Sequence, residues 1–206
     1  MKKYLILILV CVGWFSLSQL SLTGYKNRTA FAADETLVPV SAEDNIPVST
    51  DSIPTAHAKA IIKGTTSSSP IDGSVTFVQT AKGLEIGAFL INVPSPGLHG
   101  FHIHEKGSCD DEGKAAGGHY NPEGVQHGDL NRDGHGMAHA GDMGNIAVAE
   151  DGKAVYEGFL PDISLTGGKY NVEGLAVILH EKEDDFGQPT GNAGGRIGCG
   201  IIILEN

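Results

Sequence analysis

The eight-residue stretch 97–104, Gly-Leu-His-Gly-Phe-His-Ile-His, constrains the fold more than any other part of the sequence. Its alternating apolar and polar residues, with aromatic and β-branched types among them, predict a β-strand. Residues two apart in a strand point to the same face, so His102 and His104 project together while Phe101 and Ile103 face the other way. Two such imidazoles form half of a transition-metal site, although a surface strand with two incidental histidines is the simpler alternative.

Seven further segments carry strand patterns between turn-rich breaks: 58–64, 74–80, 84–93, 144–150, 153–160, 175–180 and 197–204. A long Gly-, Asp- and His-rich loop, 105–141, and a shorter loop, 181–195, interrupt them. No helical apolar repeat is sustained, and 29 glycines favour turns. The pattern predicts an all-β fold, an eight-stranded Greek-key barrel or sandwich with one long metal-binding loop and one shorter active-site loop.

The first 32 residues have the features of a targeting segment. Lys2 and Lys3 precede an apolar run, 4–15, and the sequence Ala-Phe-Ala at 30–32 is a small-x-small cleavage pattern. A signal peptide, 1–32, an acidic Pro-containing linker, 33–57, and a domain, 58–206, are therefore expected. Because the polar stretch 16–29 is long for a signal peptide, an uncleaved membrane anchor is the alternative. Either way we expect an exported protein, periplasmic or extracellular.

Cleavage would remove four of the fourteen basic residues, which leaves ten against 25 acidic residues, a formal charge of −15. Such a surface repels nucleic acid and anionic lipid, so neither is an expected partner. The two remaining cysteines, Cys109 and Cys199, form an even pair, which in an oxidising compartment indicates a disulfide. The apolar run 201–203 fits either the core or the interface of a homodimer.

Six of the nine histidines and one aspartate form a candidate metal constellation: His102, His104, His119, His127, His139, His180 and Asp142. Three histidines and a carboxylate suit tetrahedral zinc, whereas several imidazoles with an open position suit copper. His135 competes with His139, but the aspartate three residues after His139 favours His139. His99 is expected to be a core or hydrogen-bonding histidine.

Two longer motifs give the chain a specific resemblance to a known family. They are Gly-Phe-His-Ile-His-Glu-Lys-Gly-Ser-Cys at 100–109 and Gly-Asn-Ala-Gly-Gly-Arg-Ile-Gly-Cys-Gly at 191–200. With the ligand spacing between them, the chain resembles the copper/zinc superoxide dismutases over residues 58–204. The resemblance implies copper and zinc as cofactors and superoxide as substrate. It also implies dismutation to dioxygen and hydrogen peroxide by alternating reduction and oxidation of copper.

The resemblance further implies a role for each matching residue. The implied copper ligands are His102, His104, His119 and His180. The implied zinc ligands are His119, His127, His139 and Asp142, with His119 shared. Asp184 matches a carboxylate linking a copper histidine to a zinc histidine, Arg196 the catalytic cation beside copper, and Thr190 the channel wall; Cys109 and Cys199 match the family disulfide.

One departure concerns how substrate is steered. The segment Phe-Gly-Gln-Pro-Thr, 186–190, is short and has Pro189 where many relatives have a lysine. Steering of the anion must then come from elsewhere or be weaker. A non-catalytic copper/zinc-binding envelope domain is the alternative function, but such a domain should lack copper ligands or the arginine, and this chain has both.

Overall fold

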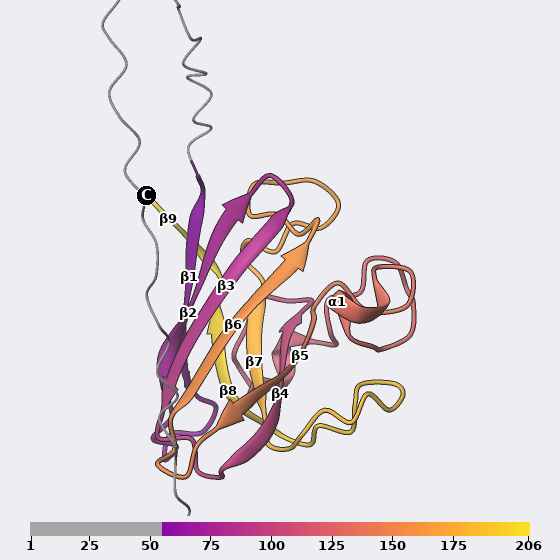
Figure 1. Ribbon diagram of the computed structural model, residues 1–206. Coiled ribbons are helices and arrows are strands. Elements are labelled where there is room, and N and C mark those ends of the chain that lie inside the picture. The colour runs from indigo at the N-terminus through magenta and orange to yellow at the C-terminus, as the bar shows by residue number, and fades with distance from the viewer. Residues whose placement is uncertain (1–54) are drawn as a thin grey trace, which may run out of the picture. The chain divides into compact units, whose positions relative to one another are not determined.

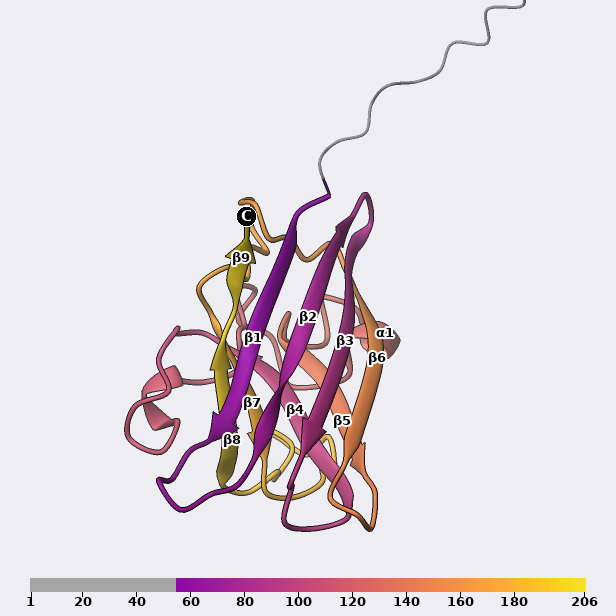
Figure 2. The ribbon, with the colours of Figure 1, turned by 90° about the vertical axis from the view of Figure 1, so that its left-hand side faces the viewer.

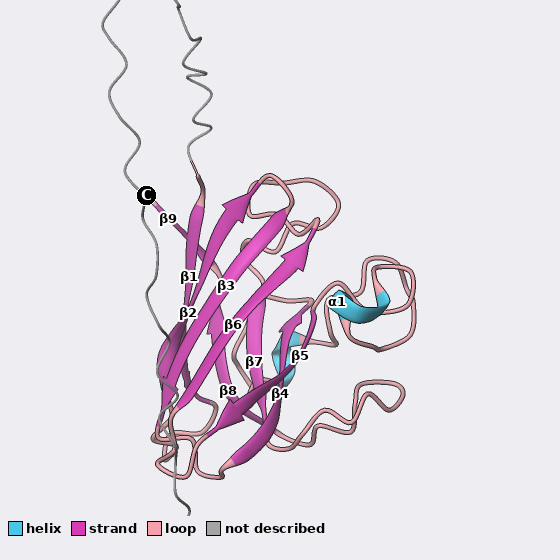
Figure 3. Ribbon diagram, viewed as in Figure 1, coloured by secondary structure: helices cyan, strands magenta, loops and turns pink. Residues whose placement is uncertain are grey.

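The computed structural model describes residues 55–206. The expected signal peptide or anchor, and the linker up to residue 54, lie outside these residues. Within them the fold is all-β, with two short helices (Figures 1 and 3). No helix in the described range is both long and apolar enough to cross a membrane.

The strands follow the predicted segments closely. They are β1 (His57–Gly64), β2 (Asp72–Thr80), β3 (Gly83–Ile91), β4 (Gly97–His104), β5 (Asp142–Val148), β6 (Ala154–Pro161), β7 (Ala176–His180), β8 (Arg196–Ile201) and β9 (Ile203–Glu205). The order in the sheet is β2-β3-β6-β5-β4-β7-β8-β1-β9, and β1 also pairs with β2. That last pairing closes eight antiparallel strands into a barrel, as predicted, and Figure 2 shows β1, β2, β3 and β6 side by side.

Several strand boundaries differ from the sequence pattern by one or two residues, and two of the differences affect the site and the core. β5 begins at Asp142, two residues earlier than expected, because Asp142 pairs with His102 across the sheet. The last predicted strand divides into β8 and β9 at Ile202, which is fully buried, whereas Ile203 is 56% exposed. Ile202 therefore belongs to the core, and Ile203 keeps the interface alternative.

The barrel interior is filled by side chains from alternate strand positions. Phe101 and Ile103 from β4 are fully buried with Phe77, Leu90 and Ile146. Since these residues face inward, His102 and His104 face the outside of the barrel. They are nevertheless buried, because the two loops cover that outer face.

The long loop, 105–141, contains a 3₁₀ turn, Lys114–Ala116, and helix α1, Leu130–Asp133. Asp129 caps α1 by accepting from the backbone N–H groups of Asn131 and Arg132. Figure 1 shows α1 and the shorter loop, 181–195, extending from the same side of the barrel.

A small second core holds the long loop against the strands. Ala116 packs with Ala176 and Ile178 of β7 and with Cys199 of β8. Cys199 forms the predicted disulfide with Cys109, across 90 residues of sequence. The disulfide ties the start of the long loop to β8.

Candidate metal centre

Three histidines of the site come from two paired strands. His102 and His104 lie on β4 and His180 ends β7, which pairs with β4 through residues 101–104. All three are at most 5% exposed. The Nε2 atoms of His104 and His180 lie 3.3 Å apart. The barrel wall thus presents three imidazoles to one point under the loops.

His119 is delivered by the long loop. A single β-bridge pairs it with His104 and places its ring centroid 4.1 Å from that of His102, 4.9 Å from that of His104 and 5.9 Å from that of His180. One ring nitrogen from each of these four histidines lies within 4.8 Å of the others. This group is the set that the sequence assigned to copper.

The other face of His119 meets a second group built around Asp142. Its Nδ1 lies 2.8 Å from Asp142 Oδ1, His127 Nδ1 lies 2.9 Å from Oδ2, and His139 Nδ1 lies 3.3 Å from Oδ1. Backbone N–H groups of Gly128 and His139 also donate to Oδ2, each at 3.0 Å. The carboxylate is therefore fixed by its own loop, and its four-residue group is the set assigned to zinc.

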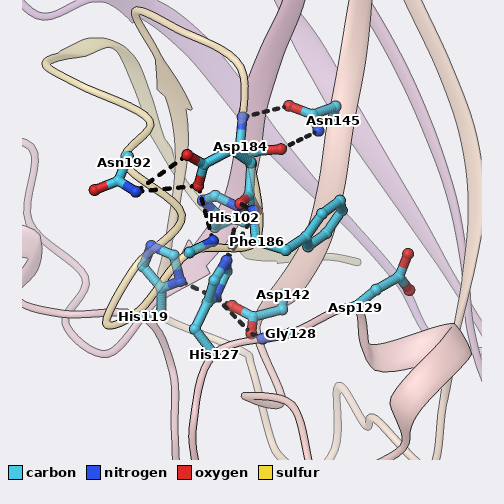
Figure 4. Close-up of polar contacts among 12 residues, drawn as sticks. His102, His119, His127, Gly128, Asp129, Asp142, Asn145, Asp184, Phe186 and Asn192 are labelled. Carbon is cyan, nitrogen blue, oxygen red and sulfur yellow. Dashed lines mark hydrogen bonds and ion pairs between the residues drawn. The ribbon is translucent and has the colours of Figure 1, made fainter.

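Asp184 joins the two groups from outside (Figure 4). Its Oδ2 accepts from His102 Nε2 at 2.8 Å, and its Oδ1 lies 2.9 Å from His127 Nε2. Gly191 leaves room for this carboxylate, because a Cβ at that position would lie 1.8 Å from Asp184 Oδ1, and its φ of +74° also favours glycine.

The pattern of unpaired nitrogens fits metal ions. Among the described residues, the buried ring nitrogens without a hydrogen bond of good geometry are His102 Nδ1, His119 Nε2, His127 Nδ1, His139 Nδ1 and His180 Nδ1 in the metal groups and His135 Nδ1 outside them. The opposite nitrogens of His102 and His127 face a carboxylate that belongs to neither metal group, that of Asp184. Buried polar atoms normally find partners, and metal-binding histidines normally bond a carboxylate or carbonyl through the second nitrogen. The residues therefore fit a metal on each side of His119.

Burial keeps most histidines of the site neutral, which is the state in which an imidazole binds a metal. Burial lowers the pKa of His119 to about 4 and that of His180 to about 3, and drives the pKa of His104 lower still. Burial opposes the charge on His127, but Asp142 and Asp184 outweigh it and raise the pKa of His127 to about 9. Bonds from these histidines hold the pKa of Asp142 well below its usual range despite burial.

Arg196 is fixed beside the copper-assigned group. Its Nη1 donates to the carbonyl of Gly113 and its Nη2 to that of Gly117, each at 2.6 Å. The Gly117 carbonyl also accepts from His104 Nδ1 at 3.0 Å, which leaves His104 Nε2 free in the neutral ring. One loop carbonyl thus orients both the cation and a ligand.

A hollow of about 540 Å³ opens next to Arg196. Thr65, Thr66 and Ser69 line it from the β1–β2 connection, and Lys114 lines it from the long loop. Lys114 lies 3.7 Å from Asp111 and 3.5 Å from Glu112, so its charge is largely offset. Thr190 is exposed on the short loop and is not part of either metal group.

His99 and His135 lie outside both metal groups. His99 is buried, with Nδ1 2.8 Å from the carbonyl of His180 and Nε2 2.9 Å from that of Ser95, so it hydrogen-bonds the backbone as expected. His135 stacks on Tyr170 at 4.0 Å between ring centroids, and its Nε2 lies 3.0 Å from the Pro161 carbonyl. The structure puts His139, not His135, against Asp142.

Sequence reasoning missed three residues that support the site. The Asp184 N–H donates to Asn145 Oδ1 at 2.8 Å, and Asn145 Nδ2 donates to the Asp184 carbonyl at 2.9 Å (Figure 4). In the same way, the Gln188 side-chain amide hydrogen-bonds the backbone N–H of His127 at 3.0 Å and its carbonyl at 2.8 Å. The Phe186 ring stacks on His127. Single polar and aromatic residues of this kind carry no periodic signal in the sequence.

A closed Greek-key barrel whose outer face carries adjoining four-histidine and three-histidine–aspartate groups defines a two-metal β-barrel protein. The family model for copper/zinc superoxide dismutase (SODC) matches residues 71–202. The chain is 39% identical over 149 residues to the copper-zinc superoxide dismutase 2 of Brassica juncea, which covers 68% of this chain and 93% of that protein.

A solved structure titled as that of the clock protein EA4 is also similar, with a TM-score of 0.65 and 35% identity over 73% of this chain and 96% of that one. The chain belongs to the copper/zinc superoxide dismutase family. It is accordingly an oxidoreductase that acts on superoxide, and its family binds copper and zinc.

Proposed function

We propose that the two groups divide the metals of the family between them. The copper ligands are His102, His104, His119 and His180. The zinc ligands are His119, His127, His139 and Asp142. The observation that carries this assignment is the set of buried ring nitrogens that face one another without hydrogen-bonding partners on both sides of His119.

Each group suits its metal chemically. Imidazoles bind copper without locking it in one oxidation state, as a thiolate-rich site would. Three histidines and a carboxylate close a tetrahedral zinc site, which has a structural role and no redox chemistry. Asp184 couples the groups, because its carboxylate holds the ring of His102 and the ring of His127 at once.

Copper would supply the one-electron chemistry of dismutation, in which two superoxide ions and two protons give dioxygen and hydrogen peroxide. Arg196 provides a fixed positive charge for the anion, since two carbonyls hold its guanidinium beside His104 and His180. His119 can take up a proton at Nε2, the buried nitrogen that has no other partner, and can release it again.

We place the approach of substrate beside Arg196, because its guanidinium shares the Gly117 carbonyl with His104 of the copper-assigned group. The wider surface is acidic, but surface charges are screened within about 10 Å at ordinary salt. Arg196 and the metal ions therefore dominate the field that the substrate meets close to the copper-assigned group. Thr190 remains a predicted residue of the channel wall, and it does not line the hollow beside Arg196.

We further propose that the protein acts outside the cytoplasm. Its N-terminal 32 residues combine two lysines, an apolar run and a small-x-small site, and its disulfide is of a kind that persists in oxidising compartments. Cell fractionation and N-terminal sequencing of the mature protein test this. A mature chain beginning at Ala33 supports export with cleavage, an intact N-terminus in the membrane fraction supports the anchor, and a cytoplasmic protein contradicts both.

The assignment is tested by superoxide consumption with the metal-loaded chain and with His104→Ala. Removing one of four copper-facing imidazoles should abolish most of the activity while zinc uptake stays close to wild type. Exposed His57, changed to Ala in the same way, is the matched control and should retain full activity. Equal activity in wild type and His104→Ala would refute the copper assignment.

A further inference from the structure

The short loop 185–191 rests directly on one zinc-assigned residue, His127, which belongs to the long loop. We propose that Phe186 and Gln188 are positioning residues that hold His127 in zinc-binding geometry and so set how fast zinc leaves the protein. The inference rests on the proposed zinc assignment and adds the means by which the second loop controls that site.

Gln188 hydrogen-bonds both backbone polar groups of His127. The His127 N–H donates to Gln188 Oε1 at 3.0 Å, and Gln188 Nε2 donates to the His127 carbonyl at 2.8 Å. His127 is only 2% exposed, and among the described residues these two groups have no other recorded partner. Buried backbone groups need partners, so the Gln188 amide does for His127 what a neighbouring strand does for a strand residue.

Phe186 holds the ring of the same residue. Its ring lies 6.2 Å from that of His127, centroid to centroid, at an interplanar angle of 16°. Arg132 of α1 also packs on the Phe186 ring, with its guanidinium carbon 4.9 Å from the ring centroid. The Phe186 N–H also donates to Asp184 Oδ1 at 2.8 Å, the atom that faces His127 Nε2.

Gln188 thus contacts the backbone N–H and carbonyl of His127, and Phe186 contacts its ring face. Phe186 also reaches Nε2 indirectly, through Asp184 Oδ1. His119, which His127 accompanies in the zinc group, has instead a β-bridge to His104 and so a strand to hold it. His127 lies in a segment without strand or helix. The loop that the sequence shows to be short is therefore the part of the chain that makes His127 rigid.

Loss of the Gln188 amide removes two partly exposed hydrogen bonds to His127, so zinc release should accelerate about tenfold. The variants are Gln188→Met, which keeps the side-chain length, and Phe186→Leu, which keeps an apolar side chain. Gln79→Met is the matched control. The Gln79 amide likewise binds backbone, accepting from Leu165 N–H and donating to the Thr80 carbonyl, but it lies away from the metal groups.

The test uses the full chain loaded with copper and zinc. Zinc transfer to a chromophoric chelator gives the release rate, visible absorption reports copper, and cobalt in place of zinc reports ligand geometry. We expect Gln188→Met and Phe186→Leu to release zinc about tenfold faster, with an altered cobalt spectrum and unchanged copper retention. Gln79→Met should lower the melting temperature but leave zinc release and the cobalt spectrum unchanged.

Wild-type zinc release and cobalt spectra in both loop variants would overturn the inference. So would loss of both metals in parallel with melting temperature in all three variants, because that is a purely structural effect. If the wild-type chain takes up copper but no zinc, the zinc assignment itself fails, and this inference fails with it.

Discussion

Replacing Asp184 by asparagine probes the link between the two metal groups with almost no change in shape. Asp184 is 1% exposed, and both its oxygens are used. An asparagine must place an NH₂ group at one of the two oxygen positions. His127 Nε2 lies 2.9 Å from Oδ1 and 3.1 Å from Oδ2, so in either orientation it keeps one acceptor and meets the NH₂ group at the other position. His102 Nε2 contacts only Oδ2, at 2.8 Å, and meets it in one orientation.

In either orientation His127 loses one of its two acceptors and the negative charge of the carboxylate, which weakens the hold on its ring. Loss of such a supporting partner typically costs about 10- to 100-fold in metal affinity, or about 1.4–2.8 kcal/mol. We therefore expect Asp184→Asn to weaken zinc binding by that factor and copper binding by less.

Competition with a chelator of known affinity, read by metal analysis, measures both effects. Asp185→Asn is the control, since Asp185 is exposed and its side chain hydrogen-bonds only Gly187 and Asn192 among the described residues. Unchanged zinc affinity in Asp184→Asn, or an equal loss in Asp185→Asn, would show that Asp184 does not orient the zinc ligand.

Three further outcomes are expected. Arg196→Gln should lower kcat/KM for superoxide by about 10- to 100-fold while both metals stay bound; metal loss in parallel would contradict a direct role for its charge. Cys199→Ser should lower the free energy of unfolding by about 4–5 kcal/mol in the chain-entropy model, since the disulfide spans 90 residues, and denaturant titration under oxidising conditions measures it. The metal-free chain should be most stable near pH 6.5. Below that pH the unfolded chain binds more protons, because burial lowers the pKa of His119 to about 4 and of His180 to about 3. Above it the stability contributed by His127, whose pKa is raised to about 9, is progressively lost. Denaturant titrations from pH 4 to 9 would show the maximum, and a flat profile would contradict the assigned charge states.

The barrel strands were predictable because their signal is local. In β4 the alternation of Phe101 and Ile103 with His102 and His104 specifies one face for the core and one for the site, and the structure keeps that division. The three-residue spacing between His139 and Asp142 also predicted that Asp142 lies with the histidines in a zinc-type group. Its position inside β5 was missed, because that depends on pairing with His102, 40 residues away in sequence.

The supporting contacts could not be predicted for a different reason. Gln188 and Asn145 act through side-chain amides on distant backbone groups, and Gly117 acts through its carbonyl. Any polar residue can make such contacts, so residue type and spacing do not single them out. Only the folded loops show which amide faces which backbone.

Anomalous diffraction at the copper and zinc absorption edges, from crystals of the metal-loaded chain, tests the central claim most directly. We predict a copper peak at His119 Nε2, within bonding distance of His102, His104 and His180, and a zinc peak at His119 Nδ1, within bonding distance of His127, His139 and Asp142. Metals that do not flank the ring of His119, or a copper peak at the Asp142 group in protein that holds both metals, would contradict it.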